Sequence, residues 1–180
     1  MSYELDDALS PDVLAQVDPG TNVLLAGPAM SGKQEFLLRV LAQGGMNGDG
    51  SVVVTTQDAA DEILEVYEDV GGKMGSFFRV IDCVGSADGN AGASDVVHTV
   101  NSPGDLTGIG IEFSEIGKTA DSRGIDRLRV GFDSISPLLM YVELQRVFRF
   151  LHVFTSQIES RDWIGLFAID PESHEQQAVN

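Results

Sequence analysis

Residues 22–45 read NVLLAGPAMSGKQEFLLRVLAQGG and join an apolar run, a loop bounded by glycines and a stretch with helical spacing. Gly27, Gly32 and Lys33 match the pattern G-x-x-x-x-G-K between that run and the helix. In this setting, backbone N–H groups, the lysine ammonium and the helix N-terminus can together surround phosphate oxygens. The pattern predicts a nucleotide-binding loop formed by Gly27, Pro28, Ala29, Met30, Ser31, Gly32, Lys33 and Gln34. A glycine-rich turn with an exposed lysine is the alternative.

Gln34 stands where this loop usually carries Ser or Thr, whose hydroxyl is a ligand of Mg²⁺. A glutamine carbonyl is also an oxygen ligand, but its side chain is longer and need not reach the same point. Nucleotide can still bind through the loop backbone and Lys33, with magnesium held weakly or through water.

Strand-like and helix-like segments alternate along the whole chain, which predicts parallel βαβ units. We expect an α/β fold with a central, mostly parallel sheet and helices on both faces, in one domain over residues 1–180. The expected strands are 22–27 (buried), 51–56, 77–84, 98–100, 127–134 and 163–170. The expected helices are 32–43 (ended by Gly44-Gly45), 59–70, about 103–120, and a deeply packed one at 136–159, while the glycine-rich residues 85–95 are expected to form a mobile loop.

A second candidate motif is RLRVGFDSISPLL, in which an apolar strand ends at Asp133 and a helix follows Pro137. This is the layout of a Walker B segment, whose aspartate holds Mg²⁺ directly or through water. The same layout also fits an aspartate that caps a helix. Because the motif accompanies the 27–34 loop, Asp133 and Gln34 are the candidate magnesium contacts.

The formal net charge of −17 and the presence of only three lysines limit the classes of partner. Acidic surfaces poor in lysine are typical of proteins from salt-rich cytoplasm, where salt screens the self-repulsion. Without a basic stripe, a nucleic-acid surface is not expected. The N-terminus lacks a signal peptide's apolar region, and the longest apolar segment carries Glu143, Arg146 and Arg149, so we expect a soluble cytoplasmic protein without membrane insertion.

The segments GPAMSGKQ, VVVTTQDAADEIL, RVGFDSISPLL and the closing IDPESHEQQAVN together resemble the RecA/KaiC-like P-loop ATPase superfamily, in a form similar to haloarchaeal KaiC-like paralogues. The resemblance spans most of the chain, and its first and third segments are the specific ones. It implies a sheet of RecA type, ATP or ADP at the loop, and assembly into rings or filaments, so that a protein partner or a homo-oligomer is expected.

The resemblance places a catalytic Glu at the end of the second strand, where this chain has Gln57 followed by Asp58. A neutral amide can orient water but does not accept its proton. Either hydrolysis is weak or absent, or Asp58 or Asp133 substitutes as the base. Members of the superfamily also continue past a HEQQ-like segment, so the chain is expected to be shortened at its C-terminus or to lack activation by a neighbouring subunit.

The remaining candidates are three separated histidines. His152 is expected to lie in the core, and His174 is a candidate contact for the nucleotide. The leading expectation for function is a nucleotide-dependent regulatory or signalling protein with little turnover. An active ATPase linked to DNA recombination or a motor is one alternative, and a scaffold with a decayed nucleotide site is another.

Overall fold

The central feature of the computed structural model, which describes residues 2–4, 16–85 and 94–173, is a six-stranded sheet. Its strand order is β3-β8-β7-β4-β5-β6, and neighbouring strands run parallel throughout. The strands are β3 (Asn22–Ala26), β4 (Gly50–Thr55), β5 (Phe78–Asp82), β6 (Val97–Thr99), β7 (Leu128–Phe132) and β8 (Ile164–Ile169). The predicted α/β class with a mostly parallel sheet is confirmed.

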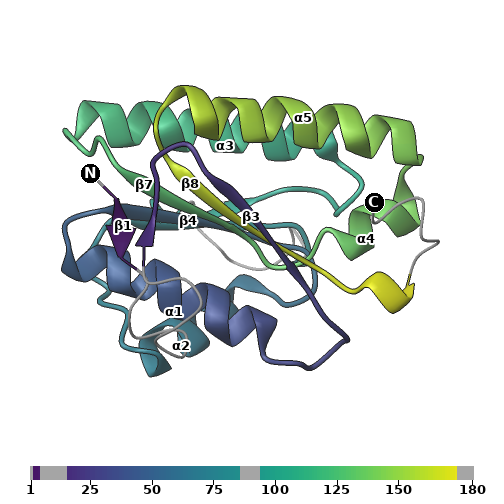
Figure 1. The fold of residues 1–180 in the computed structure, drawn as a ribbon, viewed down its shortest axis with the longest axis horizontal. Helices are drawn as coiled ribbons and strands as arrows, with labels where there is room; N and C mark the ends of the chain where they lie inside the picture. Colours follow the sequence, from purple (N-terminus) through teal and green to yellow (C-terminus); the bar gives the residue numbers. More distant parts are fainter. Residues whose placement is uncertain (1, 5–15, 86–93, 174–180) are drawn as a thin grey trace.

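Helices cover both faces of the sheet, as Figure 1 shows. The helices α1 (Lys33–Met46) and α2 (Ala60–Asp69) lie on one face. The other face carries α3 (Leu106–Ser122) and α5 (Leu144–Ser160), with the short α4 (Ser136–Tyr141) before α5 and a 3-10 turn η1 (Pro171–Ser173) after β8. Two short antiparallel strands, β1 (Tyr3–Glu4) and β2 (Gln16–Val17), have no counterpart in the sequence-based expectation, because two-residue strands carry no periodic signal.

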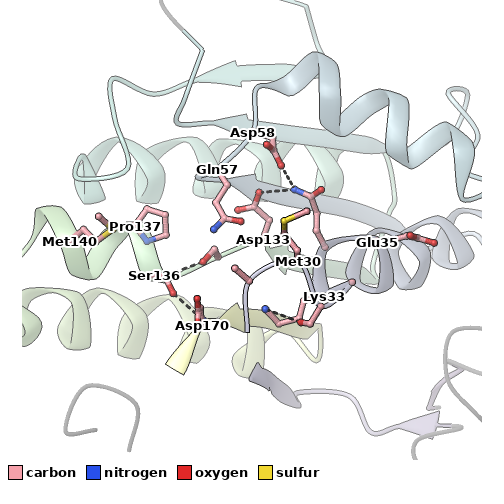
Figure 2. A pocket seen from close by; sticks show the side chains of 15 residues that line it. Met30, Lys33, Glu35, Gln57, Asp58, Asp133, Ser136, Pro137, Met140 and Asp170 are labelled. Atoms are coloured by element: carbon pink, nitrogen blue, oxygen red, sulfur yellow. Dashed lines mark hydrogen bonds between the residues drawn. The ribbon is translucent and has the colours of Figure 1, made fainter. Parts of the chain in front are cut away.

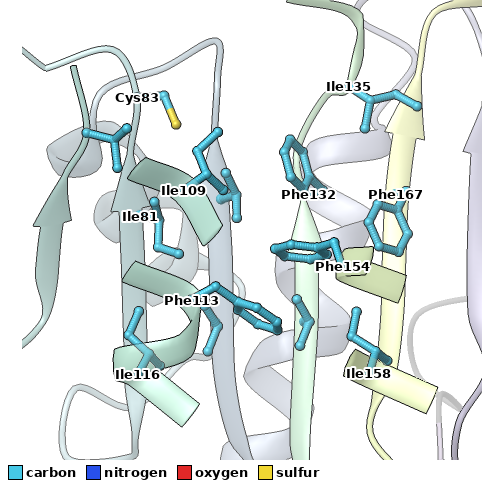
Figure 3. Packing of buried hydrophobic residues seen from close by; sticks show 14 of the residues in the cluster. Ile81, Cys83, Ile109, Phe113, Ile116, Phe132, Ile135, Phe154, Ile158 and Phe167 are labelled. Atoms are coloured by element: carbon cyan, nitrogen blue, oxygen red, sulfur yellow. The ribbon is translucent and has the colours of Figure 1, made fainter. Parts of the chain in front are cut away.

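Each helical layer encloses its own apolar core. Beneath α3 and α5, aromatic rings stack against the sheet: Phe113 and Phe154 lie with centroids 4.2 Å apart, and Phe132 stacks on Phe167 at 6.0 Å (Figure 3). On the α1 and α2 side, Tyr67 stacks on Phe78 with centroids 3.7 Å apart. Ile63 and Tyr67 of α2 are fully buried in this core.

The order of the strands creates one switch point in the sheet. From β4 the chain continues through α2 to β5, whereas from β7 it continues through α5 to β8 on the other side and over the other face. The carboxyl ends of β4 and β7 are therefore adjacent, while their following helices diverge. In open α/β sheets this arrangement leaves a crevice in which ligands bind.

The first predicted helix ends later than expected. Gly44-Gly45 does not terminate it, and α1 continues to Met46. A Cβ atom on Gly44 would lie 2.6 Å from Cδ of Arg129, so this glycine provides room for a buried arginine that crosses beneath the helix. Glycine here serves close packing rather than a helix stop.

The strand that precedes the loop is also less buried than expected. β3 is an edge strand, its positions are half-buried or exposed, and Leu24 is 51% exposed. Because a continuous apolar run is typical of a strand with two neighbours, the sequence over-predicts burial here. Within the described residues, β3 pairs with β8 alone.

The predicted long helix at 136–159 is interrupted. Val142 adopts an extended backbone conformation between α4 and α5, and its side chain packs against the α3/α5 core. α5 is amphipathic rather than deeply packed, because Phe148 and Val153 on its outer side are exposed. His152 is exposed and stacks on Phe148, so its predicted place in the core is wrong.

Within the described ranges, no helix is long and apolar enough to cross a membrane. Most of the predicted loop over 85–95, and His174, lie outside the described residues.

Candidate functional site

The loop between β3 and α1 contains two residues in the left-handed backbone region. Met30 and Gly32 both adopt positive φ angles, 58° and 86°. This turns the chain sharply so that Gly32 caps α1 without any side-chain hydrogen bond to the first turn. The first N–H groups of an α-helix have no partner inside the helix, so the start of α1 is a favourable position for an anion.

Lys33 is folded back onto its own loop. Its Nζ donates to the carbonyl oxygens of Gly27 at 2.7 Å and Pro28 at 2.6 Å, and it lies 3.1 Å from Oγ of Ser31. These acceptors are neutral, and in the described part of the chain no carboxylate forms an ion pair with this ammonium. A bound phosphate would give the ammonium charged acceptors in their place.

A cavity of about 610 Å³ lies beside this loop, at the switch point of the sheet (Figure 2). It brings together the loop, the end of β4 and the end of β7, which are distant in the sequence. Its lining contains Ala29, Met30, Ser31, Gly32, Lys33, Gln34, Glu35, Gln57, Asp58, Asp133, Ser134, Ser136, Pro137, Met140 and Asp170. Among the described residues, all those predicted for the site line the cavity except Gly27 and Pro28, whose carbonyl oxygens accept hydrogen bonds from Lys33. The predicted contact His174 lies outside the described residues.

Asp133 follows β7, and protein groups lie within hydrogen-bond distance of both its carboxyl oxygens. Oδ1 accepts from the backbone N–H and the hydroxyl of Thr56, at 2.9 and 3.1 Å. Oδ2 accepts from the hydroxyl of Thr55 at 2.9 Å and from Nε2 of Gln34 at 3.4 Å. Burial raises the pKa of this carboxyl to about 6, against the lowering effect of these four donors.

Gln34 connects the loop to both candidate acids. Its Nε2 donates to Oδ2 of Asp58 at 2.6 Å and to Asp133, as the dashed lines in Figure 2 show. Two carboxylates face this atom, so it must be the NH₂ end of the amide, because the carbonyl end would be repelled. The amide thus supplies partial positive charge between the two acids.

This geometry does not suit a magnesium ion held directly by Asp133 and Gln34. Each Asp133 oxygen lies within hydrogen-bond distance of two protein groups, and Gln34 directs a donor rather than a ligand oxygen toward the acids. Within the described ranges, no three His, Cys, Asp or Glu side chains are grouped to hold a metal ion.

Gln57 is exposed and directs its side chain into the cavity, near the end of β4 (Figure 2). Sequence reasoning missed several other residues, notably Ser136, Met140 and Asp170. Asp170 directly follows β8, and its backbone N–H donates to Oγ of Ser136 at 3.1 Å. The rule that parallel strands present their carboxyl ends at one edge would have identified Asp170, because it directly follows the last strand.

The fold is that of an α/β protein with a cavity beside a helix N-terminus, at the switch point of a parallel sheet. A family model covers residues 20–180, and the chain belongs to that family, which is described as a family of unknown function (DUF7504). No curated protein matches the chain.

Proposed function

We propose that this protein binds ATP or ADP in the cavity beside the 27–34 loop and acts as a nucleotide-dependent regulatory or signalling protein with weak or absent hydrolysis. The observation that carries the proposal is the combination of the start of α1, the Lys33 ammonium and a 610 Å³ cavity at one point. The volume lies within the range of ligand pockets, and the donors sit at the end where phosphates would bind. The resemblance to RecA/KaiC-like proteins points to the same ligand.

The arrangement of the acids supports slow turnover. A general base must accept a proton from the attacking water. Gln57 is a neutral amide, and both oxygens of the Asp133 carboxyl lie within hydrogen-bond distance of protein groups. Three further carboxylates line the cavity, those of Glu35, Asp58 and Asp170, and Oδ2 of Asp58 accepts from Gln34 at 2.6 Å.

The contacts of Gln34 also connect the loop to the residues that follow β4, which supports a role as a switch. The side chain begins on the first turn of α1, beside the phosphate position, and ends on Asp58 after β4. A phosphate bound at the loop would compete for Lys33 and change the field at Gln34. Occupancy would then be transmitted to residues 57 and 58 and to the surface that follows them.

An active ATPase is the second candidate, and the half-buried Asp58 carboxylate in the cavity is the feature that favours it. If Asp58 is released from Gln34 when nucleotide binds, it becomes a base within the cavity. Phosphate release from ATP by the wild type, and its loss in Asp58→Asn, would establish this alternative.

The test of the main proposal is calorimetric titration of ATP and of ADP at high KCl, with and without Mg²⁺. We compare the wild type with Lys33→Ala and with Lys73→Ala, which removes the same charge from an exposed lysine away from the cavity. We expect binding that Lys33→Ala weakens by about 100-fold, since hydrogen bonds to charged groups contribute about 1.5–3 kcal/mol each. Lys73→Ala should bind as the wild type does, and Mg²⁺ should leave the affinity unchanged within error.

Absence of nucleotide binding by the wild type would reject both the switch and the ATPase, and would favour a scaffold. Affinity that depends steeply on Mg²⁺ would contradict the part of the proposal that rests on Gln34.

A further inference from the structure

A second cavity, of about 430 Å³, lies between β5, β6 and α3 and shares no lining residue with the first. Its lining is polar and includes two arginines from separate elements. The residues are Arg79, Ser94, Asp95, Val97, His98, Thr99, Glu112, Thr119 and Arg123.

Arg79 is the unusual member of this set. It is the second residue of β5 and only 5% exposed, yet no carboxylate in the described part of the chain lies within ion-pair distance of it. Its guanidinium lies 4.1 Å above the centre of the Phe77 ring and donates one hydrogen bond, from Nη1 to the carbonyl of Phe78 at 3.0 Å. A guanidinium has five N–H donors, so most of those of Arg79 lack an acceptor among the described residues, and Arg79 lines the cavity.

Burial lowers the pKa of the Arg79 guanidinium, and the nearby charge of Arg123 lowers it further, while the charge of Asp95 opposes both. A buried cation is normally compensated by an opposite charge, because desolvation without a partner costs several kcal/mol.

Arg123 supplies a second cation on the same ring. Its guanidinium carbon lies 5.9 Å from the centre of Phe77, and its contact with the exposed Asp95 is loose, at 3.8 Å. On the other wall, Nδ1 of His98 lies 2.7 Å from Oε2 of Glu112, so this carboxylate already has a partner. An anion entering the cavity would meet two guanidinium groups and would need to displace only Asp95.

We propose that this cavity binds a small oxyanion, the carboxylate or phosphate group of a metabolite, between Arg79 and Arg123. Guanidinium groups recognise both oxyanions through paired N–H···O hydrogen bonds. The volume admits a molecule of metabolite size. The site is independent of nucleotide binding at the 27–34 loop, and it would give the protein a second small-molecule input.

The test is a titration followed by amide ¹H–¹⁵N NMR, because this readout separates the two cavities. Inorganic phosphate and succinate are added in separate experiments, at an ionic strength held constant with KCl. We expect shifts of the amides in β5, β6 and the end of α3 that saturate with at least one of the two anions. Shifts with phosphate alone would identify a phosphate group as the ligand, and shifts with succinate alone a carboxylate.

Arg123→Gln and Arg79→Gln are each expected to weaken this binding about tenfold or more, in keeping with the loss of a charged hydrogen-bond donor. Arg161→Gln is the matched control, because it removes an arginine paired with Asp121 that does not line the cavity. The dispersion of each spectrum reports whether the variant is folded, and Arg123→Gln carries the test if Arg79→Gln is not.

Amides of β5 and β6 that respond to phosphate and succinate no more than to KCl would overturn the proposal. So would saturable shifts that persist unchanged in Arg123→Gln. Shifts confined to residues 27–34 would show phosphate binding at the nucleotide loop only, and would equally overturn the second site.

Discussion

Arg79 and Arg129 occupy matching places in the fold, and their surroundings differ. Each is the second residue of a strand next to β4, and each is at least 95% buried, with 5% and 1% of the side chain exposed. Arg129 extends toward α1, where Nε donates to Asp49 at 3.0 Å and Nη1 donates to the carbonyls of Glu4 and Val40. Arg79 lies on the α3 side, where its guanidinium stacks on the Phe77 ring and donates one hydrogen bond to the carbonyl of Phe78.

The difference separates a structural charge from a charge available to a ligand. Around Arg129 the protein supplies the Asp49 carboxylate, which is shared with Arg127, whose Nε lies 3.1 Å from it. Around Arg79, the described residues supply no carboxylate within ion-pair distance, and a cavity borders the guanidinium. Burial alone therefore does not distinguish the two, but the presence or absence of a carboxylate does.

The largest expected loss of stability follows from substitution of Arg129. We expect Arg129→Met to lower the free energy of unfolding by about 3–5 kcal/mol, since removing one member of a buried ion pair leaves the other charge poorly compensated. Urea denaturation at constant salt would measure it. A loss below about 1 kcal/mol, the range of exposed ion pairs, would mean that Arg127 alone satisfies Asp49 and that the two arginines are less different than their contacts indicate.

Asp133 is a buried acid, and the stability that its carboxyl contributes depends on pH. Its pKa in the folded protein, about 6, is higher than the 3.8 of an unperturbed carboxyl, so between these values the folded state binds more protons than the unfolded state. Stability contributed by this group is therefore present at pH 4 and is lost as pH rises through 6, by up to about 3 kcal/mol. The difference in unfolding free energy between wild type and Asp133→Asn should follow this course, and a difference independent of pH would contradict it.

The smallest expected change in unfolding free energy follows from substitution of Arg79. We expect Arg79→Met to change the unfolding free energy by less than about 1 kcal/mol, or to raise it, because the substitution removes a cation that lacks a partner and keeps the apolar stem. The same urea denaturation measures it. A loss as large as that in Arg129→Met would show that the Arg79 charge is compensated within the folded chain, and the contrast between the two arginines would fail.

Local patterns predicted most of the secondary structure, because their causes are local. The 3.6-residue spacing in α2 and the β-branched run of β4 correspond to elements within one residue of the predicted ends. The predictions were wrong where tertiary contacts determine the ends or the burial of an element. Gly44 lies inside a helix because Arg129 crosses beneath it, Val142 interrupts a predicted helix, and β3 lies at the edge of the sheet, which its composition does not indicate.

In the candidate site, too, local patterns predicted some features, while others depend on tertiary contacts. The positions of Lys33, Gln57, Asp58 and Asp133 around one cavity follow from motif order and from the common edge of parallel strands. The donor role of Gln34 was not predictable, because it depends on two carboxylates that come from distant strands. Arg79 likewise has no sequence signal, since nothing in the pattern of β5 indicates which charges will lie near it.

The edge position of β3 bears on how copies of the chain behave together. Residues 21 and 27 direct their backbone groups toward β8, so the alternate residues Asn22, Leu24 and Ala26 direct theirs outward, on a strand with no charged side chain. Such an edge is a template for another strand. At low ionic strength, the charge of −17 holds copies apart, but at about 1 M salt the screening length is only about 3 Å. We therefore expect self-association to increase with salt, so that the ionic strength of the cell, rather than a dedicated interface, would set the size of the assembly.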